Sequence, residues 1–148
     1  MEARRRRFLA RLGGLCAAVL AARGSAAEPP LAELEAVTRG ATVRPGRVAL
    51  EIPRLAEAAN SIPCKVTVDS PMTAEDHVRA IHLFAPKNPR PAVATFHLGP
   101  RCGRAEVATR IRLSGTQRVL AVAELSDGSF WSAGQEVAVT ISACYDGS

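Results

Sequence analysis

The amino-acid sequence predicts a mainly β protein, an antiparallel sandwich of about seven short strands preceded by one short helix. Hydrophobic and polar residues alternate in several runs between residues 48 and 141, which is the period of a half-buried strand. Short clusters of Pro, Gly, Asn, Asp and Ser separate these runs. Many short strands divided by such turns are typical of the immunoglobulin-like type of sandwich.

The single helix is expected at the start of the domain. Leu31, Leu34 and Val37 recur at helical spacing after Pro29-Pro30. Gly40 follows them and is suited to end a helix, since glycine adopts a positive φ at little cost. We therefore expect a short helix that ends near Gly40.

The strands are expected in seven runs of the chain. Four of them alternate clearly, at residues 48–52, 64–68, 107–113 and 137–141, and three more are rich in β-forming residues, at 78–85, 92–98 and 118–125. Asp127-Gly128 lies between two of these runs and predicts a two-residue hairpin turn. Residues 73–76, which begin with Thr73, predict one capped helical turn at the edge.

Residues 1–27 have the character of a bacterial export signal. Arginines are followed by an apolar stretch over residues 12–22, which is shorter than the roughly 20 residues that span a bilayer. Ser25 and Ala27 are small residues that suit a cut after Ala27. The order Arg5-Arg6-Arg7-Phe8-Leu9 indicates the twin-arginine route, which exports folded protein to the periplasm; an ordinary secretory signal is the alternative. Cys16 lies within the apolar stretch, so we expect neither a lipid nor another membrane anchor.

Cleavage after Ala27 changes what the composition implies. The chain has 19 Lys+Arg and 14 Asp+Glu, of which six arginines and one glutamate lie in residues 1–27, so 13 of each sign remain. A mature chain without net charge argues against an electrostatic nucleic-acid binder. The remaining length, about 120 residues, suits one domain with one core.

Three cysteines remain after cleavage: Cys64, Cys102 and Cys144. An odd number in an oxidising compartment leaves one thiol without an intrachain partner. We expect Cys64 and Cys102 to form an intradomain disulfide, with two unpaired thiols as the alternative. Cys144 lies four residues from the C-terminus, beyond the last alternating run, where a chain end is usually accessible and its thiolate can react.

The residues do not predict an active site of the protein's own. Of the three histidines, His82 and His97 lie in neighbouring predicted strands, but no carboxylate or cysteine at ligand spacing accompanies them or His77, so we expect structural or surface roles and no metal. The chain contains no nucleophile elbow, phosphate-binding glycine loop, HExxH or CxxC. We therefore expect no catalytic residues and no cofactor.

Several blocks of the sequence resemble the SoxY subunit of the periplasmic thiosulfate-oxidation system. The resemblance covers most of the chain after residue 27, and a twin-arginine signal is typical of that family. The blocks are residues 66–76, 81–91, Phe96-His97, residues 109–113, Thr116-Gln117 and residues 121–130.

The resemblance implies an immunoglobulin-like domain over residues 28–140 and a C-terminal arm over residues 141–148. It implies that Cys144 carries the sulfur substrate covalently and that the protein is a carrier without catalysis of its own. The implied partners are a SoxZ-like β subunit, which forms a heterodimer with the chain, and three enzymes: a c-type cytochrome, a manganese hydrolase that releases sulfate and a sulfur dehydrogenase.

The end of the chain departs from the family pattern. The family arm ends Gly-Gly-Cys-Gly-Gly, whereas this chain has Ala143 before Cys144 and Tyr145 and Asp146 after it. Glycines keep an arm slender and freely bending, so the side chains here add bulk and charge. Two alternatives to a carrier follow: a SoxY paralogue that acts as a protein-interaction module, and a small redox or metal-binding domain that uses Cys144 with a histidine.

Overall fold

The computed structural model describes residues 32–141, which form one short helix, one 3-10 turn and nine strands. The helix α1 spans Ala32–Thr38 and the 3-10 turn η1 spans Pro100–Cys102. The strands are β1 (Val43–Pro45), β2 (Val48–Glu51), β3 (Leu55–Ala58), β4 (Ile62–Val68), β5 (Val78–Phe84), β6 (Ala92–His97), β7 (Glu106–Ile111), β8 (Gln117–Leu125) and β9 (Phe130–Ile141). The mainly β prediction is confirmed.

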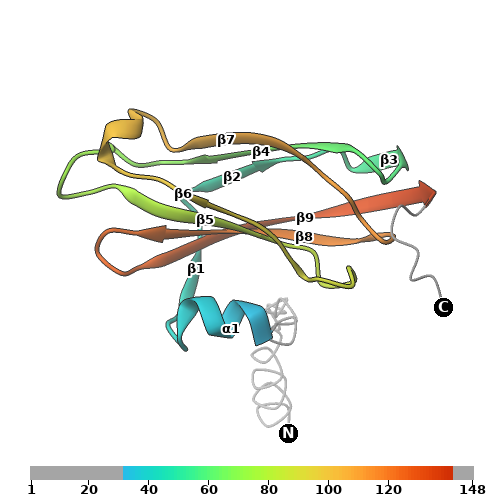
Figure 1. Ribbon diagram of the computed structural model, residues 1–148, viewed down its shortest axis with the longest axis horizontal. Helices are drawn as coiled ribbons and strands as arrows, with labels where there is room; N and C mark the ends of the chain where they lie inside the picture. The colour runs from blue at the N-terminus through green and yellow to red at the C-terminus, as the bar shows by residue number, and fades with distance from the viewer. Residues whose placement is uncertain (1–31, 142–148) are drawn as a thin grey trace, which may run out of the picture.

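The strands form two sheets packed face to face (Figure 1). The larger sheet has the order β1-β9-β8-β5-β6, with β3 also paired to β9, and the smaller has the order β2-β4-β7. In the smaller sheet, alternate residues of β4 and β7 point toward the larger sheet, as the period of two in the sequence requires. Among the largest buried side chains there are Ile62, Val66, Ile81, Leu83 and Val119.

A second apolar cluster lies on the outer face of the larger sheet, against α1. It consists of Phe84, Val122 and Phe130, with Leu34 and Val37 of the helix packed onto them. Figure 1 shows α1 lying across that face, away from the smaller sheet. The expected N-terminal helix is confirmed, and Gly40 after it has a φ of +79°, the left-handed conformation that favours glycine.

Two strands were not expected from the sequence. β1 and β3 have three and four residues and bury few side chains, so neither shows alternation. Both pair with β9 in parallel: Val43 lies opposite Phe130, and Leu55 lies opposite Ala138. They therefore support the two halves of β9 on the edge that β8 leaves free.

Two turns differ from their predictions. Residues 73–76 form no helical turn; the hydroxyl of Thr73 accepts the amide proton of Asp76 at 3.0 Å, and the chain then extends into β5. The hairpin between β8 and β9 has a three-residue loop rather than two. The Leu125 carbonyl accepts the amide of Gly128 at 3.0 Å, and Gly128, with φ +81°, completes the turn and bulge that such loops use.

Candidate functional site: the end of the sandwich where the chain leaves β9

The C-terminal half of β9 is held on both edges. On one edge Gln117 of β8 lies opposite Val137, and on the other β3 pairs as far as Ala58 opposite Ile141. Side chains add to the ladder, because the Val139 amide donates to Thr116 Oγ1 at 2.9 Å and the Thr140 hydroxyl donates to the Glu57 carbonyl at 2.6 Å. The chain thus leaves the domain from a firmly anchored strand.

Cys144, the cysteine expected to react, lies outside the described residues, as do the export signal and its cleavage position. Cys144 is the third residue after Ile141. At about 3.6 Å per extended residue, the Cα of Cys144 lies within about 11 Å of that of Ile141. Any chemistry at Cys144 therefore takes place near this end of the sandwich.

The disulfide expected between Cys64 and Cys102 is not formed; both are free thiols. Cys64 lies opposite Thr109 in the β4–β7 ladder, and Thr67, about 10 Å farther along β4, lies opposite Glu106. Cys102 precedes Glu106 and lies in η1, beyond that end of the ladder. A disulfide needs Cα atoms within about 7 Å, so strand pairing keeps the two thiols apart.

The two thiols lie in opposite environments. Cys64 points into the core, where burial raises the pKa of its thiol to about 11, whereas Cys102 is exposed. We expect iodoacetamide to modify Cys102 in the folded protein and Cys64 only after unfolding in guanidinium, since the thiolate is the reacting species. Mass mapping of the peptides that contain each residue measures this. Equal labelling of both in the folded protein would contradict the burial of Cys64.

The histidines do not gather near the end of β9. His82 and His97 lie on neighbouring strands of the larger sheet, as expected, and His82 is buried. Its Nδ1 lies 3.0 Å from the Thr95 hydroxyl, while its Nε2 has no hydrogen-bond partner among the described residues. His77 lies at the other end of the sandwich, where its amide donates to the Ser126 hydroxyl at 3.1 Å.

Burial lowers the pKa of His82; the carboxylate of Glu124 opposes this shift and His97 adds to it. As the pH falls below about 6.5, the unfolded chain binds a proton at His82 that the folded protein does not, so stability should fall. The free energy of unfolding should fall by about 1.4 kcal/mol for each pH unit by which folding lowers the pKa of His82. Urea unfolding between pH 7.5 and 5 measures it, and His82→Asn should flatten the dependence. His97→Asn, at an exposed position, is the control and should leave most of the pH dependence of stability in place.

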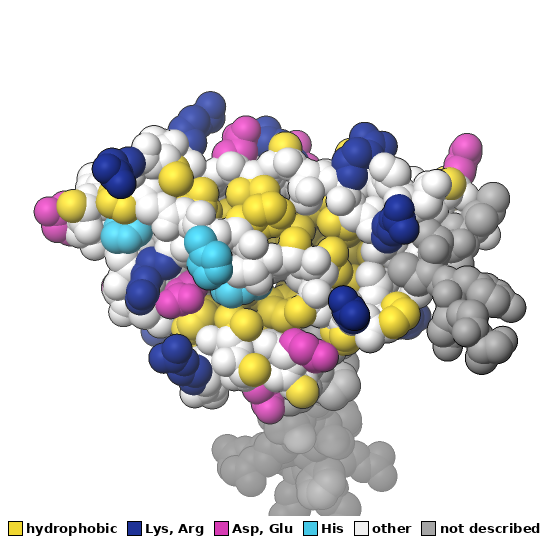
Figure 2. Space-filling view, viewed as in Figure 1, with side chains coloured by type: hydrophobic (Ala, Val, Ile, Leu, Met, Phe, Trp, Pro, Cys, Tyr) yellow, Lys and Arg dark blue, Asp and Glu magenta, His cyan; other side chains and the backbone are white. Residues whose placement is uncertain are grey.

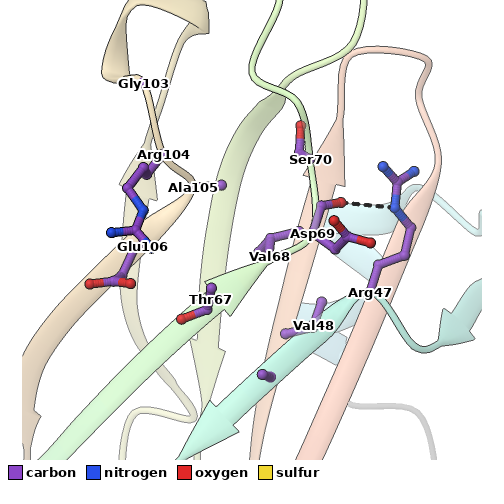
Figure 3. A pocket seen from close by; sticks show the side chains of 11 residues that line it. Arg47, Val48, Thr67, Val68, Asp69, Ser70, Gly103, Arg104, Ala105 and Glu106 are labelled. Carbon is purple, nitrogen blue, oxygen red and sulfur yellow. Dashed lines mark hydrogen bonds between the residues drawn. The ribbon is translucent and has the colours of Figure 1, made fainter.

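A shallow hollow of about 430 Å³ lies between β2, β4 and the η1–β7 segment (Figure 3). Arg47 and Arg104 contribute to its lining. The Arg47 guanidinium is held within the fold: Nε donates to the Asp69 carbonyl at 3.0 Å, a terminal nitrogen lies 3.8 Å from the Asp76 carboxylate, and the group stacks on Trp131 at 5.7 Å. Sequence reasoning did not identify this hollow, because its walls come from three separate segments.

The hollow lies too far from the end of β9 to receive Cys144 of the same chain. Trp131, which contacts Arg47, precedes Ile141 by ten residues of one continuous strand, about 33 Å. That distance is about three times the reach of Cys144 from Ile141. The hollow and the end of β9 are therefore separate features of the molecule.

Between residues 32 and 141, no group of three or more His, Cys, Asp or Glu side chains could hold a metal ion. In that same part of the chain no helix is long and apolar enough to span a membrane. What this end of the sandwich provides is a rigid base for the residues that follow Ile141.

Comparison with known proteins supplies the family. The family "Sulfur oxidation protein SoxY" matches residues 34–144, three quarters of the chain, and the match ends at Cys144. Among solved structures, the sulfur carrier protein SoxY from Chlorobium limicola f thiosulfatophilum is 27% identical and has a TM-score of 0.62, with 74% of this chain and 94% of that chain covered. No curated protein matches.

Other solved structures share the fold at lower identity. A superoxide reductase (neelaredoxin) from Ignicoccus hospitalis is 20% identical with a TM-score of 0.57, over 64% of this chain and 80% of that chain. A putative superoxide reductase from Thermotoga maritima is 20% identical with a TM-score of 0.55, over 66% and 87%. The likeness to these two structures shows only that this chain shares their sandwich fold. The family match, in contrast, extends from residue 34 to Cys144. The chain therefore belongs to the SoxY family of sulfur oxidation proteins.

Proposed function

We propose that this protein is the sulfur carrier of a periplasmic sulfur-oxidising (Sox) system and that it binds thiosulfate-derived sulfur covalently on Cys144. The observation that carries the proposal is the extent of the family match, which spans the domain and ends at this cysteine. Its position supports the role, because a thiol three residues beyond an anchored strand can enter another protein while the domain stays outside. Cys64 is buried and cannot do so.

The chemistry follows from the thiol. Attack of the Cys144 thiolate on thiosulfate forms a bond between the cysteine sulfur and the outer sulfur of thiosulfate. This step releases two electrons, and we propose the c-type cytochrome as their acceptor. The product is Cys–S–S–SO₃⁻. Hydrolysis of the S–SO₃ bond, by the proposed manganese enzyme, releases sulfate and two protons and leaves the persulfide Cys–S–S⁻. A sulfur dehydrogenase then oxidises the remaining sulfur, so the carrier contributes the nucleophile and the partners contribute the catalysis.

We also propose a SoxZ-like subunit as a permanent partner. Two edge strands, β6 and β7, have a single pairing partner each among the described strands, so their outer backbone groups are available to another β chain. Three half-buried hydrophobic residues lie on or beside these strands: Phe96, Leu98 and Val107. Figure 2 shows hydrophobic side chains along the middle of the face in view. Because a twin-arginine signal exports folded protein, a partner without a signal could cross the membrane in complex with this chain.

The experiment is intact-mass analysis of protein purified from thiosulfate-grown cells. We expect an added mass that corresponds to sulfur or thiosulfate, that a reductant removes and that Cys144→Ala lacks. Cys102→Ala is the matched control, since Cys102 is the exposed thiol of the described chain, and this variant should keep the adduct. An adduct lost with Cys102 and kept without Cys144 would overturn the assignment.

The second candidate is an interaction module that no longer carries sulfur. The feature that favours it is the arm sequence, where Ala143, Tyr145 and Asp146 replace small, uncharged glycines. In that case Cys144 would stay unmodified in thiosulfate-grown cells while the complex with the second subunit still formed. The same mass measurement therefore separates the two functions.

A further inference from the structure

Four segments of the chain meet around the end of β9: residues 54–61, 85–91, 110–118 and 136–141. Hydrogen bonds connect them. Lys87 Nζ donates to the Thr116 carbonyl at 2.8 Å, and the Thr116 hydroxyl accepts the Val139 amide at 2.9 Å. The Ala138 amide donates to the Arg54 carbonyl at 2.8 Å. These residues form one surface, which surrounds the point where the chain leaves the sandwich.

This surface is strongly basic. It carries six exposed basic side chains, and we call five of them the basic collar: Arg54, Lys87, Arg90, Arg110 and Arg112. Glu57 is also exposed there, and Glu136 lies opposite a further arginine, Arg118, in the β8–β9 ladder. The four ion pairs found among residues 32–141 include no member of the collar. The charge of the collar is thus not neutralised by the rest of the described chain.

The positive charge is concentrated rather than spread evenly. Outside the four segments, residues 32–141 contain seven basic and nine acidic residues, so the remainder of the domain is slightly negative. Figure 2 shows Lys and Arg side chains over the right-hand end of the face in view, where β9 ends. A cluster of one sign attracts an opposite surface and speeds the encounter with it.

An apolar side chain lies within the collar. Leu55 of β3 is 61% exposed and is the one exposed large hydrophobic residue of the described chain. It lies opposite Ala138 of β9 and next to Arg54 in sequence. An exposed apolar residue with charged residues around it has the arrangement of a small protein interface, in which a polar rim encloses an apolar contact.

We propose that the basic collar and Leu55 form the surface with which the protein docks on the sulfur-oxidising enzymes that receive Cys144, and that these enzymes present an acidic rim. The inference rests on the proposed carriage by Cys144. Since Cys144 lies within about 11 Å of Ile141, an enzyme that takes in this cysteine also approaches the collar. The collar residues line neither the hollow at Arg47 nor a second hollow of about 400 Å³ beside Glu51 and Pro63. The arrangement therefore suits an extended protein surface better than a small free anion.

The test compares two triple variants in the complete carrier complex. The collar variant is Arg54→Gln with Arg90→Gln and Arg112→Gln. The control is Arg39→Gln with Arg101→Gln and Arg104→Gln, which removes the same charge from exposed side chains away from the collar. The assay is thiosulfate-dependent cytochrome c reduction by the reconstituted Sox enzymes, with the carrier complex as the varied component. Thermal unfolding by circular dichroism confirms that both variants are folded.

We expect the collar variant to lower kcat/KM about tenfold at low ionic strength with kcat within about twofold, because steering acts on the encounter. In about 0.5 M NaCl the difference should disappear, since salt screens exposed charges. The control should match the unsubstituted protein. Equal losses in the two variants, or turnover of the unsubstituted protein that does not depend on salt, would overturn the proposal.

Three further outcomes separate this proposal from others. If Cys144→Ala abolishes turnover while the collar variant is fully active, the carrier function stands and the docking surface is wrong; if Cys144→Ala stays active, the carrier function itself fails. Vesicles of equal parts phosphatidylglycerol and phosphatidylcholine test a lipid surface. Collar-dependent vesicle binding with unchanged turnover would assign the collar to lipid and overturn docking on an enzyme.

Discussion

Replacement of Cys144 by alanine should abolish thiosulfate-dependent turnover of the reconstituted Sox enzymes. The reason is chemical: Cys144 is the single cysteine of residues 141–148, so without its sulfur atom the arm has no thiolate to hold the substrate. The loss should be at least about 10³-fold, down to the background of the assay, as for removal of any covalent nucleophile. Stability should not change, because Cys144 follows the last residue of the sandwich. Thermal unfolding measured alongside the assay checks this.

Cys102→Ala is the control for this experiment, because it removes an exposed thiol from η1, beyond the far end of the β4–β7 ladder. We expect it to retain full turnover. Cys144→Ser is a stricter test, since it keeps the size of the side chain and removes only the thiol. If Cys144→Ser were active, covalent sulfur carriage at this position would be excluded.

Replacement of Phe84 by alanine should cause a large loss of stability. Phe84 is 1% exposed and forms the outer apolar cluster with Val122 and Phe130, beneath Leu34 and Val37 of α1. Removing a buried phenyl ring leaves a cavity and typically costs about 3–5 kcal/mol. Urea unfolding followed by circular dichroism at pH 7.5 gives the free energy of unfolding.

The same substitution should loosen α1, which rests on this cluster. Amide hydrogen exchange over Ala32–Thr38 should then speed up more than exchange in the β4–β7 ladder. Leu55→Ala is the matched control, because Leu55 is exposed and its loss should change stability by less than about 0.5 kcal/mol. A cost below about 1 kcal/mol for Phe84→Ala would contradict the packing of the helix on the sheet.

The sequence predicted the fold well because alternation is a local property. Each of the seven runs that it identified corresponds to a strand, and the helix lies where Leu34 and Val37 indicate it. β1 and β3 were missed since strands this short leave no period to detect, and both exist through pairing with β9. In the β8–β9 loop, Asp127-Gly128 indicated a hairpin correctly, but the loop is longer by one residue.

The disulfide prediction was wrong for a different reason. Cys64 and Cys102 were paired because each lies near a predicted strand, and spacing along the chain does not show which residues face each other. In the structure, the β4–β7 register places Thr109 opposite Cys64 and leaves Cys102 beyond the ladder in η1. The register depends on side chains from both strands, which β5, β6 and η1 separate in the chain, so it is not read from one segment alone.

The sequence by itself determined seven of the nine strands, the helix, the resemblance to SoxY and the choice of Cys144 as the residue of interest. These depend on the order of residues along the chain, which alternation, turn chemistry and motif blocks record directly. Only the tertiary structure decided that Cys64 is buried, that Cys102 is exposed away from it and that Arg47 lines a hollow. It also decided that five basic residues from three segments gather where the chain leaves β9, because surfaces form between segments that sequence distance does not relate.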